Sequence, residues 1–154
     1  MAGQIESRLN ELGIVLPDAP APAANYVPTV RTGDLLFVSG QVAKTDEGLI
    51  VGTLGDGFSV EAGQAAARIC GLNLIAQAKA ACGGDLDRVR RVVKLVGFVH
   101  ATSDFGNHPA VINGASDLMV EVFGDKGRHA RSAVGSSSLP FGIAVEVEAI
   151  FEVE

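Results

Sequence analysis

The residues best suited to chemistry lie near the end of the sequence. There Arg131 precedes a Leu139-Pro140 turn and an apolar segment that carries Glu146. A guanidinium presents a planar fork of donors that suits a carboxylate ligand. A nearby glutamate can hold or activate a water molecule. These residue types therefore suggest a site that binds an anion and directs water toward it.

Segment 144–154 predicts a strand with one dry face, because its side chains alternate in character. One face holds Val145, Val147, Ala149, Phe151 and Val153, and the other holds Glu146, Glu148, Ile150, Glu152 and Glu154. If the chain folds back as a hairpin around Ser138 and Leu139, a symmetric register places Arg131 opposite Glu146 on one face. A structural ion pair explains that pairing too, and for an arbitrary Arg and Glu on adjacent strands it is the commoner case.

Other reactive side chains show no arrangement typical of a site. His100, His108 and His129 lack the spacing of metal ligands, so we expect no metal. Cys70 and Cys82 are too far apart for a metal or redox motif, which favours small core residues. The common serine-hydrolase and dinucleotide-binding motifs are absent.

The charge balance argues against binding to nucleic acid. Lysine and arginine number 12 against 18 acidic residues, a formal net charge of -6. The cations at Arg88, Arg90, Arg91 and Lys94 are interleaved with valines in a strand-like run, which is a poor surface for tracking phosphates. The sequence shows neither a signal peptide nor a stretch apolar enough to span a membrane. We expect a cytoplasmic protein that binds neither nucleic acid nor membranes.

The 154 residues are enough for one domain with its own core, preceded by an arm. Residues 3–12 predict a short amphipathic helix that stops at Gly13. Residues 17–28 are rich in proline and predict an extended connector. We therefore assign residues 1–23 to an N-terminal arm and residues 24–154 to the domain.

The domain begins with a predicted hairpin over residues 27–42, with its turn at Thr32-Gly33-Asp34. The second strand ends at Ser39-Gly40-Gln41. A glycine at this point either lets the backbone approach a ligand or marks a bulge, and the sequence favours neither.

Two helices and three strands follow. Ser59 is the expected N-cap of a helix that runs to Cys82, and a second helix starts at Pro109 and ends at Gly124. Between them, residues 89–99 are apolar on both alternating faces, which predicts a strand buried on both sides. The order is thus strand, strand, helix, strand, helix, strand, strand. Helices on one face of a mixed sheet leave the other face, which is partly apolar, free for association.

The string Arg-x-x-Val-Gly-x-x-x-Leu-Pro-x-Gly-x-x-Val-Glu-x-Glu-Ala, at residues 131–149, resembles the C-terminal signature of the reactive intermediate deaminases. These are the Rid or YjgF proteins, formerly called endoribonuclease L-PSP. Three more segments fall in the family's order: Asn25-Tyr26-Val27, Phe37-Val38-Ser39-Gly40-Gln41-Val42, and Asp104-Phe105 before a helix with Asn113. The single motifs are weak, but four in order make a strong match over residues 24–154.

The resemblance implies a chorismate-mutase-like α+β fold, with a mixed sheet and two helices on one face. It also implies a homotrimer whose sheets form a central barrel with ligand clefts between subunits. Arg131 would hold a substrate carboxylate and Glu146 would position or activate water. The cleft would be completed by Tyr26, Asn113 and backbone groups at Ser39, Gly40 and Ala133. No cofactor is required, because a 2-imino acid is already electrophilic and needs chiefly orientation and water.

Two functions of different classes fit these residues. The first is an enamine/imine deaminase that hydrolyses reactive 2-imino acids of the 2-aminoacrylate type to 2-keto acids and ammonia. The second is a non-catalytic trimer that binds small carboxylates or has a regulatory role, with Arg131 as an anchor and Glu146 as a structural residue. Ala133 stands where family members often have cysteine, and the N-terminal arm and the loop at residues 106–109 also differ. The chain therefore resembles a divergent branch of the family.

Overall fold

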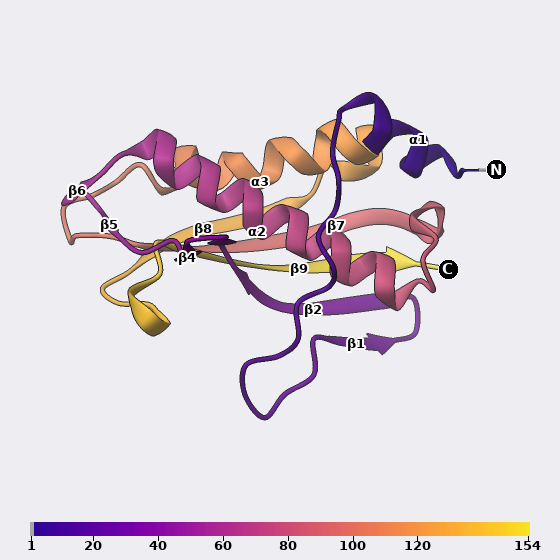
Figure 1. Cartoon of the computed structure of the whole chain (residues 1–154), viewed down its shortest axis with the longest axis horizontal. Helices are drawn as coiled ribbons and strands as arrows, with labels where there is room; N and C mark the ends of the chain where they lie inside the picture. The colour runs from indigo at the N-terminus through magenta and orange to yellow at the C-terminus, as the bar shows by residue number, and fades with distance from the viewer. Residues whose placement is uncertain (1) are drawn as a thin grey trace.

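Residues 2–154 are described by a computed structural model, in which five strands form one mixed sheet (Figure 1). The strands are β1 (Thr29–Thr32), β2 (Leu35–Val42), β7 (Val89–His100), β8 (Ala130–Ser136) and β9 (Val145–Val153). Their order across the sheet is β1, β2, β9, β7, β8. Strands β7 and β8 are parallel, and the other neighbouring pairs are antiparallel. The predicted α+β class with a mixed sheet is confirmed.

Two long helices, α2 (Val60–Ala81) and α3 (His108–Phe123), cover one face of this sheet, and the short α1 (Gln4–Glu11) lies beside α3 (Figure 1). The smaller elements are β3 (Lys44–Thr45), β4 (Gly48–Leu49), β5 (Thr53–Leu54), β6 (Gly57–Phe58) and three 3-10 turns at Leu86–Arg88, Pro140–Gly142 and Gly124–Gly127. The predicted order of the main strands and helices is confirmed.

Local signals begin and end the helices where the sequence predicts. Ser59 Oγ accepts a hydrogen bond of 3.1 Å from the Ala62 amide and so caps α2. Pro109 lies in the first turn of α3, where its missing N–H removes no helical hydrogen bond. Gly124 follows the last residue of α3 and has a φ of +62°. Glycine adopts this left-handed backbone conformation without steric cost.

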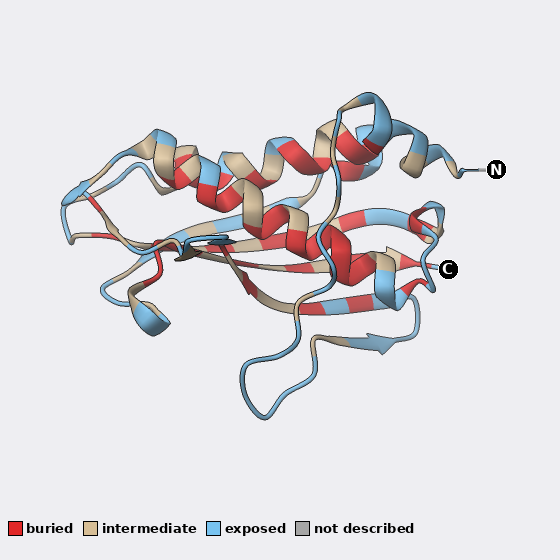
Figure 2. Cartoon of the chain, viewed as in Figure 1, coloured by how far each residue is buried: buried red, intermediate tan, exposed pale blue. Residues whose placement is uncertain are grey.

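Strand β9 alternates between buried and half-buried residues along its whole length. The buried residues, red along β9 in Figure 2, belong to one core cluster with buried residues of α2 and α3. Phe151 is fully buried and meets Phe123 of α3 edge-on, with the ring centroids 6.4 Å apart. Burying such a side chain contributes about 1.5–3 kcal/mol to stability. The predicted dry face of this strand is confirmed.

Within residues 2–154, no helix covers the opposite face of the sheet (Figure 1). Three apolar residues of the sheet strands are exposed, namely Val30 of β1, Phe37 of β2 and Val134 of β8. In β7, Leu95 points to the helices and is fully buried, whereas Phe98 points the other way and is half-buried. A single chain therefore buries β7 on one face only, and the prediction of a strand buried on both sides is not met within one chain.

The N-terminal helix is tied to the domain by one carboxylate. Asp87 accepts hydrogen bonds of 2.9 Å from the amides of both Gln4 and Ile5. Leu9, on the same helix, is buried in the core. Residues 17–28 then run across α2 toward β1 (Figure 1), and the Gln77 side chain donates to the Pro20 carbonyl at 2.6 Å. The boundary at residues 23 and 24 stays a prediction.

We expect Asp87→Ala to speed amide hydrogen exchange across residues 4–11, because the first amides of α1 lose their acceptor. The hydrogen bonds from Ile5 and Gln4 lower the pKa of Asp87. A folded-state pKa below the unfolded value means that the anchor is present at neutral pH and is lost as the pH falls through the folded pKa. Exchange in the exposed-loop variant Asp46→Ala is the control. Unchanged protection of α1 in Asp87→Ala would contradict the assignment.

No helix in the described part of the chain is long and apolar enough to cross a membrane.

Candidate active site

Arg131 lies on β8 and reaches toward α3. Its Nη1 donates to Asn113 Oδ1 at 2.7 Å and to Ser116 Oγ at 3.1 Å. Both acceptors are neutral, so they orient the guanidinium without cancelling its charge. Within residues 2–154, Arg131 forms no ion pair, and its Nε and Nη2 donate no hydrogen bond. One edge of the guanidinium is therefore available to a carboxylate.

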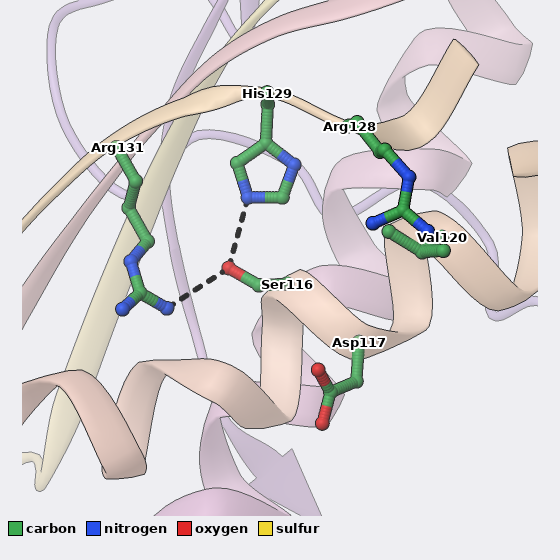
Figure 3. Close-up of a pocket in the computed structure, with 6 residues that line it drawn as sticks. All are labelled: Ser116, Asp117, Val120, Arg128, His129 and Arg131. Atoms are coloured by element: carbon green, nitrogen blue, oxygen red, sulfur yellow. Dashed lines mark hydrogen bonds between the residues drawn. The ribbon is translucent and has the colours of Figure 1, made fainter. Parts of the chain in front are cut away.

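Ser116 also contacts His129, which precedes Arg131 on the same side of the chain (Figure 3). Ser116 Oγ lies 2.9 Å from His129 Nε2, and His129 Nδ1 lies 2.6 Å from the Gly127 carbonyl oxygen. A carbonyl only accepts, so Nδ1 carries the proton and Nε2 accepts the Ser116 hydroxyl. Burial of the ring lowers the pKa of His129, and the positive charge of Arg131 lowers it further. The hydrogen bond to Gly127 raises the pKa but only partly offsets the effect of burial. The imidazole is thus neutral at pH 7.

These side chains surround an open hollow of about 300 Å³ on the surface. It is lined by Ser116, Asp117, Val120, Arg128, His129 and Arg131 (Figure 3). The volume suits a small ligand together with a few water molecules, since one water occupies about 30 Å³ in the liquid.

Glu146 lies on β9 and points to the sheet face away from the helices. Within the described residues its carboxylate accepts no hydrogen bond and has no cationic partner. Burial raises the pKa of Glu146, and the neighbouring charge of Glu148 raises it further. A carboxylate in this state can accept a proton at a higher pH than an exposed glutamate does.

Gly40 makes room for that carboxylate. A methyl group at Gly40 would overlap Glu146 Oε1. The register between β2 and β9 shifts between Val38 and Gln41, so Gly40 lies in a β-bulge. The bulge interpretation of this glycine is confirmed, and the approach of a ligand to its backbone remains a proposal.

A second, larger cavity of about 1020 Å³ lies beside this bulge, under the connector that follows α1. It is lined by Tyr26, Ser39, Gly40 and Glu146, among other residues. The Ser39 hydroxyl donates to the Val27 carbonyl at 2.8 Å. The phenol oxygen of Tyr26 accepts from the Ala23 amide at 3.3 Å. Four of the predicted site residues therefore come together here.

The predicted hairpin that places Arg131 opposite Glu146 is wrong. Strand β7 lies between β8 and β9, with Arg131 paired to Leu95 and Glu146 paired to Phe98. Leu95 faces the helices and Phe98 faces away, so the two side chains are on opposite faces of the sheet.

The reason for the difference is the path of the chain after α3. Strand β8 returns parallel to β7, as a helical crossover requires, and occupies the edge of the sheet. The connection through the 3-10 turn at Pro140–Gly142 then crosses to the other side of β7, where β9 gains a neighbour on each side. An interior position satisfies both hydrogen-bonding edges of the apolar β9, which a terminal hairpin would not do.

One chain thus holds the seven predicted residues in two groups. Arg131 and Asn113 are hydrogen-bonded to each other, and Ala133 follows Arg131 on the same face of β8. Tyr26, Ser39, Gly40 and Glu146 line the larger cavity. The family profile described as "YjgF/chorismate_mutase-like, putative endoribonuclease" matches residues 6–151. The chain belongs to this YjgF family.

Individual YjgF relatives cover nearly the whole chain. Protein TCP17 of Trypanosoma cruzi is 53% identical over 98% of this chain and 95% of its own length. A 2-iminobutanoate/2-iminopropanoate deaminase of Dermatophagoides farinae is 32% identical over 92% of this chain and 95% of its own length. The crystal structure of Atu1372 from Agrobacterium tumefaciens, whose function is unknown, is 48% identical with a TM-score of 0.89, covering 97% of this chain and 92% of that one. The chorismate-mutase-like fold implied by the YjgF resemblance is confirmed.

The motifs that identify the YjgF family do not include Ser116 or His129, and sequence reasoning missed both. It set His129 aside with the other histidines because no metal spacing linked them. A usable signal exists in the spacing of these residues. His129 precedes Arg131 by two positions in the extended chain that enters β8, and Ser116 follows Asn113 by three positions in a helix, so each lies on the same side as its neighbour. The contact between helix and strand, however, is visible only in the fold.

We expect Glu146→Gln to raise the melting temperature by about 1–3 °C at pH 7.5, after allowance for solvent screening of a half-buried group. The raised folded-state pKa means that the glutamate stabilises the fold most below its unfolded pKa and loses that contribution as the pH rises through the folded pKa. The advantage of glutamine should therefore shrink toward pH 4.5. Thermal melts of wild type, Glu146→Gln and the exposed-loop control Glu47→Gln measure this. A lower melting temperature for Glu146→Gln at pH 7.5 would show that the carboxylate has a stabilising partner.

Proposed function

We propose that this protein is an enamine/imine deaminase that hydrolyses 2-imino acids of the 2-aminoacrylate type to 2-keto acids and ammonia. The observation that carries the proposal is the state of Arg131. Two neutral acceptors hold its guanidinium at Nη1, and no acidic residue of the described chain neutralises it. An oriented, uncompensated guanidinium on a small hollow suits the carboxylate of a small acid.

The reaction needs little beyond orientation. With the substrate carboxylate on Arg131, water adds to the imine carbon to give a carbinolamine. The C–N bond then breaks, the nitrogen leaves as ammonia, and the carbinol oxygen becomes the keto oxygen. The resemblance of the chain to a 2-iminobutanoate/2-iminopropanoate deaminase supports this substrate class.

The proposed assembly is a homotrimer, in which the two groups of site residues meet across the contact between copies. Arg131 lies on β8, at one edge of the sheet. Ser39 and Gly40 lie beyond the part of β2 that pairs with β1, near the other edge. A ring of copies joined edge to edge would bring Arg131 of one copy near Ser39 and Gly40 of the next, beside the cavity that these two residues share with Glu146. The uncovered apolar face, with Val30, Phe37 and Val134, supports such association.

A coupled assay tests the function. A dehydratase generates 2-aminoacrylate, and the loss of the imine is followed with and without the purified protein. Faster formation of keto acid with the wild-type protein is the expected result. Binding of a small keto acid without any acceleration across several imino acids would overturn the deaminase and favour the non-catalytic carboxylate-binding protein. Light scattering after gel filtration measures the mass, and a monomer would overturn the trimer.

A further inference from the structure

A serine and a histidine that neither the YjgF motifs nor the proposed function assigns stand beside the substrate anchor. Gly127, His129, Ser116 and Arg131 form a continuous chain of hydrogen bonds, with distances of 2.6, 2.9 and 3.1 Å. Side chains of the last three line the same hollow (Figure 3). We propose that Ser116 and His129 are a general-base dyad for the proposed hydrolysis, in which Ser116 takes a proton from the attacking water and passes its own to His129.

The direction of each hydrogen bond supports this role. A serine hydroxyl has one donor and two acceptor positions. The proton of Ser116 goes to His129 Nε2, and one lone pair accepts from Arg131 Nη1. One lone pair of Ser116 Oγ remains for a water molecule in the hollow. The arrangement has the parts of an activated hydroxyl: a nucleophile or relay, a base within hydrogen-bond reach, and a third group that orients the base.

The charges around His129 suit a base at neutral pH. Burial of the ring and the positive charge of Arg131 lower the pKa of His129, and Arg128 from the preceding loop and Asp117 of α3 line the same hollow. In Figure 3 the Asp117 carboxylate turns away from His129. The ring is therefore neutral at pH 7, as its lowered pKa indicates, and Gly127 keeps Nε2 free of a proton. Protonation of His129 at lower pH places a proton on Nε2 and removes the acceptor.

The proton transfers balance in two steps. In the first, the water oxygen bonds to the imine carbon, and the π pair of the protonated C=N bond moves to nitrogen. The water proton moves to Ser116 Oγ while the Ser116 proton moves to His129 Nε2. In the second, the imidazolium returns a proton through Ser116 to the carbinolamine nitrogen. The C–N bond breaks with its electron pair on ammonia, and the hydroxyl loses its proton to solvent as the keto group forms.

This inference rests on the proposed function, and its test uses Ser116→Ala, His129→Gln and the double variant in the imine assay. We expect each single variant to lower kcat by about 100-fold, a typical loss for general-base catalysis. The double variant should be no worse than either single one, because the two residues act as a unit. The Kd for pyruvate, measured by calorimetry, should change by less than about threefold, since Arg131 keeps its bond to Asn113. His108→Gln, a histidine outside the dyad, is the matched control.

The pH profile separates a base from a structural residue. Wild-type kcat should fall on the acid side as His129 takes a proton, and His129→Gln should lack that acid limb. Single-variant kcat values near wild type with the acid limb retained would overturn the dyad and leave the deaminase standing. Losses that multiply in the double variant, or a parallel loss of pyruvate binding, would also overturn it, because the two residues would then serve structure or affinity separately. No turnover by the wild type would overturn both proposals.

Discussion

Replacing Arg131 by alanine should lower kcat/KM for 2-imino acids by at least about 100-fold. Each charge-assisted hydrogen bond from a guanidinium to a carboxylate contributes about 1.5–3 kcal/mol, and the free edge of Arg131 can make two of them. A loss of about 3 kcal/mol in transition-state stabilisation lowers kcat/KM by slightly more than about 100-fold. The coupled imine assay measures the rate constants, and calorimetry with pyruvate measures the loss of carboxylate binding.

Two further variants make the Arg131 result specific. Arg131→Lys keeps the charge but loses the planar fork, so it should recover only part of the activity. Arg90→Ala removes an exposed guanidinium that pairs with Glu154 and should behave as wild type. The folded structure should survive, because within the described chain the Arg131 side chain contributes hydrogen bonds only to Asn113 and Ser116. Full activity of a folded Arg131→Ala protein would remove the basis of the proposed function.

Gly114→Ala should lower the free energy of unfolding by about 2 kcal/mol and the melting temperature by about 4–8 °C. Gly114 is where α3 approaches the backbone of α2, and an added methyl group would overlap the carbonyl oxygen of Gln64. A backbone oxygen cannot rotate away as a side chain can, so the two helices must separate. Alanine stabilises a helix by about 1 kcal/mol relative to glycine, and the expected loss of about 2 kcal/mol already includes this gain.

The same change should disturb the site, because Gly114 lies between Asn113 and Ser116 in α3. Moving α3 away from α2 moves both acceptors of Arg131, so we also expect a higher KM in the imine assay. Gly106→Ala is the matched control, since a methyl group there meets no atom within 4 Å. Equal melting temperatures for the two variants would contradict the close approach of Gly114 in α3 to the Gln64 backbone in α2.

Local patterns predicted much of the fold correctly. The alternation in β9, the cap at Ser59, the helix start at Pro109 and its end at Gly124 each depend on interactions within a few residues. Such interactions are written in consecutive sequence positions. The predicted pairing of β8 with β9 failed, because a symmetric turn around Ser138 treats these strands as isolated neighbours and ignores the competing edge of β7.

The sequence by itself determined the family and the main elements, because the YjgF signature and the amphipathic patterns lie within short stretches. It also singled out Arg131 as the residue that we propose to bind an anion. Only the tertiary structure decided which side chains meet. It placed Glu146 with Tyr26 in one cavity, away from Arg131, because β7 is inserted between their strands. It also joined Ser116 to His129, because the return of the chain from α3 into β8 sets a helix face against a strand edge. Contacts of this kind depend on the packing of whole elements, which no local pattern records.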